Sequence, residues 1–108
     1  MRWNLENARA ILPEVRRLTG EAVARVDALS DRRGDQLESA ERVEVEQELA
    51  RVVSAWIRGM EALGVDVKGA WLVDFDTGSG CYCWRWPEAQ LEYFHGYDEG
   101  FAGRVRIQ

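Results

Sequence analysis

The sequence predicts an α+β fold: a long antiparallel helical hairpin packed on a three-stranded antiparallel β-meander, followed by an ordered C-terminal tail. Across residues 5–63 apolar side chains recur every three or four positions, the pattern of amphipathic helices. From residue 65 the spacing changes to two, and β-branched and aromatic residues become frequent. With 108 residues the chain is sized for one domain, comprising the hairpin (1–64) and the meander with its tail (65–108).

The first helix is predicted to begin at Leu5, because the side chain of Asn4 can cap its free backbone N–H groups. Its apolar stripe continues to Leu29. Pro13 lies inside this stripe and cannot donate a hydrogen bond to the carbonyl of Arg9, so we expect a kink near Leu12 rather than a break. Residues 30–35 are polar and predict a linker.

The second helix is predicted from Leu37 to Leu63, with Gly64 ending it. Its apolar stripe consists of Val45, Leu49, Val52, Trp56, Met60 and Leu63. Because the linker is short, the two helices should pack antiparallel. Two helices leave one side of each uncovered by the other, so the partner we predict is a second copy in a homodimer, or another protein.

Three strands are predicted in the second half, at residues 71–75, 81–86 and 90–94, with turns at 76–80 and 87–89. Alternation directs the aromatic residues of the first two strands toward the helices. The opposite face then carries Asp74, Arg85 and the two cysteines, Cys81 and Cys83. If Leu91 and Tyr93 of the third strand point inward, Glu92 joins this outer face, although a slip of one residue would reverse that assignment.

Several motifs together resemble the prokaryotic domain of unknown function 2203 (DUF2203) family. They are Asn4–Ala8, Leu12-Pro13, Gly64-Val65, Val67-Lys68, Leu72–Phe75, Cys83–Arg85, His95-Gly96 and Asp98–Arg104. The resemblance covers nearly the whole chain, and the Phe-Ala-Gly-Arg ending and the Cys-Trp-Arg strand are its most specific parts. It implies a cytoplasmic prokaryotic domain and supplies no activity.

Composition and charge restrict the partners. The net charge is -5, with 19 acidic residues against 14 basic ones, which argues against nucleic acid or an anionic membrane surface as the main partner. No apolar run approaches the roughly 18 residues of a membrane span. We also expect no signal peptide, because residues 1–4 are followed directly by an amphipathic pattern and not by an apolar region. We therefore expect a cytoplasmic protein whose two cysteines stay reduced.

The strongest candidate site is the segment around the only histidine, His95. An imidazole with the carboxylates of Asp98 and Glu99 could hold a divalent metal ion such as zinc or manganese, and Glu92 could add a further ligand. Alternatively, His95 could act as a general base oriented by one of these acids. No activated nucleophile accompanies it in the sequence, because Ser79 lies in a turn and the cysteines lie on a strand.

Other polar and aromatic residues have simpler interpretations. Arg85 with Asp74, and Arg104 with Asp98 or Glu99, predict structural ion pairs, with an anion pocket of both arginines as the alternative. Only His95 could join the two thiols in a metal site, and we favour small apolar filler as their role. Phe101 is interpreted as a plug that fixes the tail to the core.

Together these features predict a non-enzymatic binding or interaction module. Its recognition surface would comprise Arg85, His95, Asp98, Glu99 and Arg104. The alternative is a metal-dependent protein or small enzyme that uses His95 with the nearby carboxylates, in which case a divalent metal is the expected cofactor.

Overall fold

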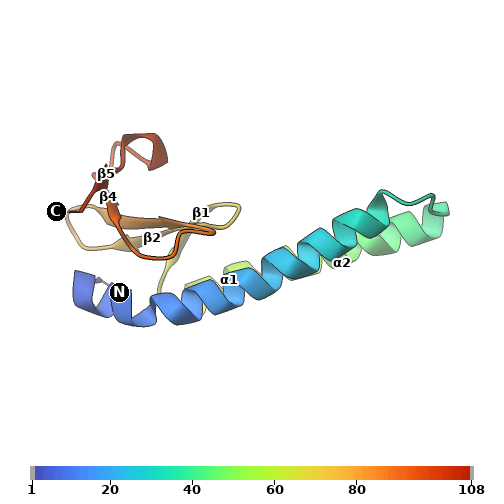
Figure 1. The fold of residues 1–108 in the computed structure, drawn as a ribbon, viewed down its shortest axis with the longest axis horizontal. Coiled ribbons are helices and arrows are strands. Elements are labelled where there is room, and N and C mark those ends of the chain that lie inside the picture. The colour runs from blue at the N-terminus through green and yellow to red at the C-terminus, as the bar shows by residue number, and fades with distance from the viewer. Residues whose placement is uncertain (1, 108) are drawn as a thin grey trace.

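A computed structural model describes residues 2–107 and has an elongated shape, 51 × 25 × 22 Å. Two antiparallel helices, α1 (Leu5–Arg33) and α2 (Ser39–Ala62), form a hairpin along the longest axis (Figure 1). The sheet covers one end of this hairpin, the end that carries the N-terminus, while the other end projects beyond it (Figure 1). The predicted α+β fold with a helical hairpin and an antiparallel sheet is therefore confirmed.

Both helices are present, with shifted ends. The Asn4 side chain caps α1 by accepting a hydrogen bond from the backbone N–H of Asn7 at 2.8 Å, and α1 continues through Pro13 without a break. Because α1 continues to Arg33, the connection lies at residues 34–38 rather than at the predicted 30–35. Gly64 follows the end of α2 with a φ of 84°, the left-handed conformation that favours glycine after a helix.

The sheet has five antiparallel strands in chain order, not three. They are β1 (Asp66–Gly69), β2 (Leu72–Asp76), β3 (Cys81–Arg85), β4 (Tyr93–His95) and β5 (Val105–Arg106). The two strands that the sequence did not reveal, β1 and β5, are short and largely exposed, so no alternating burial pattern reveals them. β1 and β5 extend the sheet on both sides of the three central strands.

The core lies between the helices and the inner face of the sheet. Its largest fully buried side chains are Trp84, Phe75 and Met60. The indole N–H of Trp56 on α2 donates to the hydroxyl of Thr19 on α1 at 2.9 Å, so these two buried polar groups are hydrogen-bonded to each other inside the core. The inward direction predicted for the aromatic residues of the first two predicted strands, 71–75 and 81–86, is confirmed, because all five pack on this core: Trp71, Phe75, Tyr82, Trp84 and Trp86.

The predicted register of the third strand is wrong. Tyr93 pairs with Cys83 and therefore lies on the outer face with His95, not on the inner face. Leu91 precedes the strand and is buried in the core, as expected. The difference arises because β4 begins only at Tyr93, after an irregular segment in which alternation does not hold.

The tail after β4 folds over the outer face of the sheet, on the side away from the helices (Figure 1). It contains a short 3-10 helix, Phe101–Gly103, followed by β5. Phe101 is only half-buried and lies outside the core, so its predicted role as a core plug is wrong. The tail instead forms one wall of a cavity on the outer face.

Within residues 2–107 no helix has both the length and the apolar character needed to cross a bilayer.

Candidate functional site

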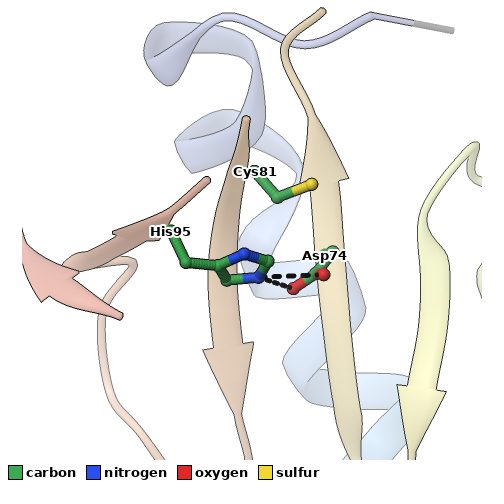
Figure 2. Close-up of side chains that lie close together, drawn as sticks. All are labelled: Asp74, Cys81 and His95. Atoms are coloured by element: carbon green, nitrogen blue, oxygen red, sulfur yellow. Dashed lines mark hydrogen bonds and ion pairs between the residues drawn. The ribbon is translucent and has the colours of Figure 1, made fainter. Parts of the chain in front are cut away.

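Three buried side chains gather on the outer face of the sheet. Asp74 comes from β2, Cys81 from β3 and His95 from β4, so three neighbouring strands supply one residue each (Figure 2). Their exposed fractions are 3%, 5% and 5%. The strand register creates the cluster, because Cys81 pairs directly with His95 on one side and with Asp76, two residues beyond Asp74, on the other.

Gly80 allows β4 to approach β3 at this point. A Cβ atom at Gly80 would lie 2.8 Å from the carbonyl oxygen of His95 and would also overlap the ring of Phe94. Any larger residue would therefore push away the strand that carries the imidazole. Gly80 is thus part of the local structure that positions His95 beside Cys81.

His95 is hydrogen-bonded through both ring nitrogens. Its Nδ1–H donates to the carbonyl oxygen of Gly96 at 2.8 Å, since a carbonyl can only accept. Its Nε2 lies 3.0 Å from each carboxylate oxygen of Asp74, a contact that requires one proton between the two groups, on Nε2 or on the carboxyl. With this proton on Nε2, the pair is an imidazolium beside a carboxylate.

The pKa of His95 reflects opposing effects. Burial by itself would lower this pKa, but the bonds to Gly96 and Asp74 and the negative charges of Asp74 and Glu99 raise it above its usual value. The local arrangement thus favours a positive charge next to Asp74. A metal cation in place of the Nε2 proton would satisfy the same two groups.

Cys81 is held as a neutral thiol. Burial and the negative charges of Asp74 and Asp76 raise the pKa of Cys81 to about 11. No hydrogen bond between Cys81 and His95 is found among residues 2–107. A thiol in this environment is a poor nucleophile, whereas a nearby dication would favour its thiolate.

One potential ligand atom from each of Asp74, Cys81 and His95 lies within 4.8 Å of the others, the only such group of three among residues 2–107. Two ligand atoms bound to a tetrahedral zinc ion at about 2.1 Å are about 3.4 Å apart. To admit the ion, the contact of 3.0 Å between His95 and Asp74 would need to widen by a few tenths of an ångström, and the Cys81 sulfur, within 4.8 Å of the other two atoms, would need to lie about 3.6 Å from them. Oxygen, nitrogen and sulfur donors together suit zinc and related transition metals, not magnesium or calcium.

The cluster forms the floor of a cavity of about 330 Å³ on the outer face. The walls of this cavity are formed by Lys68, Leu72, Tyr97, Gly100 and Phe101. The hydroxyl of Tyr97 donates to a carboxylate oxygen of Asp76 at 2.6 Å, which fixes that wall. A ligand entering the cavity would therefore meet the three donor side chains directly.

The structure does not gather the predicted metal ligands His95, Asp98 and Glu99. Asp98 is exposed, and the Glu99 carboxylate accepts a hydrogen bond from the backbone N–H of Gly96 at 3.2 Å. Glu92 pairs with Arg106 instead of approaching His95. His95 is correctly placed at the site, but its neighbours are Asp74 and Cys81, which come from other strands.

The two arginines have different partners from those predicted. Arg104 forms a bidentate ion pair with Glu88, at 3.0 and 2.6 Å, not with Asp98 or Glu99. Its guanidinium also stacks between the rings of Tyr93 and Phe101, at 4.0 and 4.2 Å.

Arg85 is exposed and pairs in register with Leu72, while Asp74 lies opposite Cys83 and binds His95. The predicted ion pair between Arg85 and Asp74 is therefore wrong, although both residues do lie on the outer face. Because Arg104 is occupied by Glu88, the structure also does not support an anion pocket made by the two arginines.

Sequence reasoning missed Cys81, which it assigned to apolar filling. The useful signal was its strand parity, since Cys81 and Asp74 were both assigned to the outer face. What was lacking was the pairing of β3 with β4, which alone brings His95 opposite Cys81.

These observations define a small α+β protein with a buried Asp–Cys–His cluster on the free face of its sheet. A family model described as "Uncharacterized conserved protein (DUF2203)" matches residues 2–107, so the chain belongs to the DUF2203 family. No curated protein matches the chain, and no solved structure does.

Proposed function

We propose that this protein binds a divalent transition-metal ion, zinc being the best fit, through Asp74, Cys81 and His95. The observation that carries the proposal is the meeting of three different donor groups within 4.8 Å on the floor of a cavity. Three protein ligands leave one tetrahedral position open, as in zinc sites that bind an exogenous molecule.

The hydrogen bond between His95 and Gly96 supports this proposal. Histidine ligands in metal sites commonly donate the second ring N–H to a carbonyl or carboxylate, which sets the tautomer and the ring orientation. Here Nδ1–H is held by Gly96, so Nε2 faces Asp74 as the prospective ligand atom. The same residue thus has both the ligand atom and the orienting partner that a metal site needs.

The role we propose is binding rather than nucleophilic catalysis. The raised pKa of Cys81 and its lack of a hydrogen bond to His95 within residues 2–107 argue against a cysteine–histidine nucleophile pair. This proposal combines the two functions predicted from the sequence, a binding module and a metal-dependent protein. Arg85, Asp98, Glu99 and Arg104 then contribute to the surrounding surface and not to the metal.

The test is the metal content of untagged protein, measured by elemental analysis and by competition with a chromogenic chelator. We expect one zinc ion per chain, lost in Asp74→Asn, Cys81→Ala and His95→Ala. Cys83→Ala is the matched control, because Cys83 is also buried, on the same strand and the same face, but outside the ligand group. Circular dichroism should show that each variant is folded.

Two outcomes would contradict the proposal. One is a wild-type protein that neither contains zinc nor competes for added zinc. The other is an equal loss of metal from Cys81→Ala and Cys83→Ala. That result would mean that the loss of side-chain packing, and not the loss of a metal ligand, lowers the metal content.

The homodimer predicted from the sequence remains a prediction. One observation favours it: Val43 and Val53, both on α2, are 54% and 38% exposed. Light scattering should give twice the monomer mass, and Val43→Glu should lower it. A monomeric mass at every concentration would contradict the prediction.

A further inference from the structure

Lys68 supplies a positive charge to the wall of the cavity above the metal ligands. It lies on β1 and lines the cavity together with Asp74, Cys81 and His95. No ion pair with an acidic side chain is found for Lys68 among residues 2–107. Of the acidic groups near the cavity, Asp74 binds His95 and Asp76 binds Tyr97, while Asp66, opposite Asp74 on β1, is exposed to solvent and does not line the cavity. The ammonium group is therefore available to a ligand.

The sum of charges indicates which ligand fits. With a dication bound, the carboxylate of Asp74 and the thiolate of Cys81 cancel the metal charge, and His95 is neutral. Lys68 then leaves one positive charge among the residues that line the cavity. A monoanion would neutralise it, whereas a phosphate dianion would leave an excess negative charge in a partly enclosed site.

The remaining walls indicate the rest of the ligand. Leu72 and Phe101 provide apolar surface, and the volume of about 330 Å³ lies at the small end of the range for ligand pockets. A short apolar body would pack against these two side chains. Its carboxylate could reach the open metal position on the floor and Lys68 on the wall.

We infer that the cavity binds a small aliphatic monocarboxylate, one oxygen occupying the open metal position and Lys68 pairing with the carboxylate. This inference rests on the proposed metal site. It goes beyond that proposal by naming the ligand class and the residue that recognises its charge.

The experiment uses Co²⁺ as a spectroscopic substitute for zinc in the full chain and butyrate as the probe. Co²⁺ binding alone should produce visible d–d absorption, and butyrate should then change this spectrum saturably. Butyramide, the neutral analogue, should not. We expect Lys68→Ala to bind Co²⁺ as the wild type does but butyrate about fivefold more weakly, the scale of a partly exposed ion pair.

Two further variants separate charge recognition from other effects. Lys68→Arg should restore most of the butyrate affinity, because it keeps the positive charge. Arg58→Ala removes the same charge from an exposed position on α2, outside the cavity, and should leave butyrate binding unchanged.

The failures are distinguishable. If no Co²⁺ spectrum appears, both the metal site and this inference are overturned. If Co²⁺ binds and butyrate leaves its spectrum unchanged, or if Lys68→Ala binds butyrate as tightly as the wild type, only this inference is overturned.

Discussion

The Nε2 atom of His95 lies 3.0 Å from both carboxylate oxygens of Asp74, a residue that precedes it by 21 positions. Both side chains are buried on the outer face of the sheet, one strand apart, with Cys81 on the strand between them (Figure 2). Two charged groups withdrawn from water in this way depend on each other, because each would be costly to bury alone.

Removing one member of the buried pair should destabilise the metal-free protein strongly. For His95→Ala or Asp74→Asn we expect a loss of about 3–5 kcal/mol in the free energy of unfolding, because the partner is left buried without compensation. Urea unfolding in the presence of a chelator measures it. The double variant should lose less than the sum of the single ones.

Asp66→Asn provides the control for this pair. Asp66 faces Asp74 across β1 and β2 but is exposed, so the change should stay within about 0.5 kcal/mol. If His95→Ala and Asp74→Asn each lowered the free energy of unfolding as little as Asp66→Asn does, the pair would not contribute to stability.

The contribution of His95 should depend on pH with a definite sign. Its pKa is raised above the ordinary 6.5 in the folded state, so the folded protein holds the proton more tightly than the unfolded chain. The stabilisation is then complete below about pH 6.5 and is lost as the pH rises through the folded pKa. In metal-free protein, the difference in unfolding free energy between wild type and His95→Gln should shrink as the pH rises from about 5 to about 9. A difference that grows over this range would contradict the ion pair.

Arg104→Lys should loosen the tail although the charge is kept. Arg104 holds Glu88 with two hydrogen bonds and stacks between Tyr93 and Phe101, and an ammonium group reproduces neither arrangement. We expect a loss of about 1–2 kcal/mol in stability and faster hydrogen exchange in residues 101–106. Exchange equal to that of the wild type would mean that the stack does not hold the tail.

Phe101→Ala should cost less than a core substitution. The ring is half-buried beside Arg104 and the cavity, outside the core cluster, so we expect about 1–2 kcal/mol rather than the 3–5 kcal/mol typical of a buried phenylalanine. Phe75→Ala, in the core, provides the comparison. Equal losses in urea unfolding would show that Phe101 belongs to the core after all.

The predictions from sequence succeeded where the pattern is local. The periodic stripes predicted both helices, and alternation correctly directed Trp84 inward and Asp74 outward. The helix end at Arg33 and the short strands β1 and β5 were not predicted, because neither depends on a strong burial pattern. Tyr93 was assigned to the wrong face because an irregular segment precedes its strand.

The candidate site was predicted only in part for the same reason. The chemistry of the only histidine predicts a site at His95, and closeness in the sequence makes Asp98 and Glu99 its predicted partners. In the folded chain the nearest donors come from β2 and β3, since pairing across strands brings together residues that are distant in the sequence.

The sequence by itself determined the hairpin, the face of the sheet that packs on it, and the donor types available. These follow from the spacing of apolar residues, which acts over a few positions of one helix or strand. Only the tertiary structure decided that Asp74, Cys81 and His95 meet. Their meeting depends on the register between three strands, and a shift of one residue would turn one of the side chains to the opposite face.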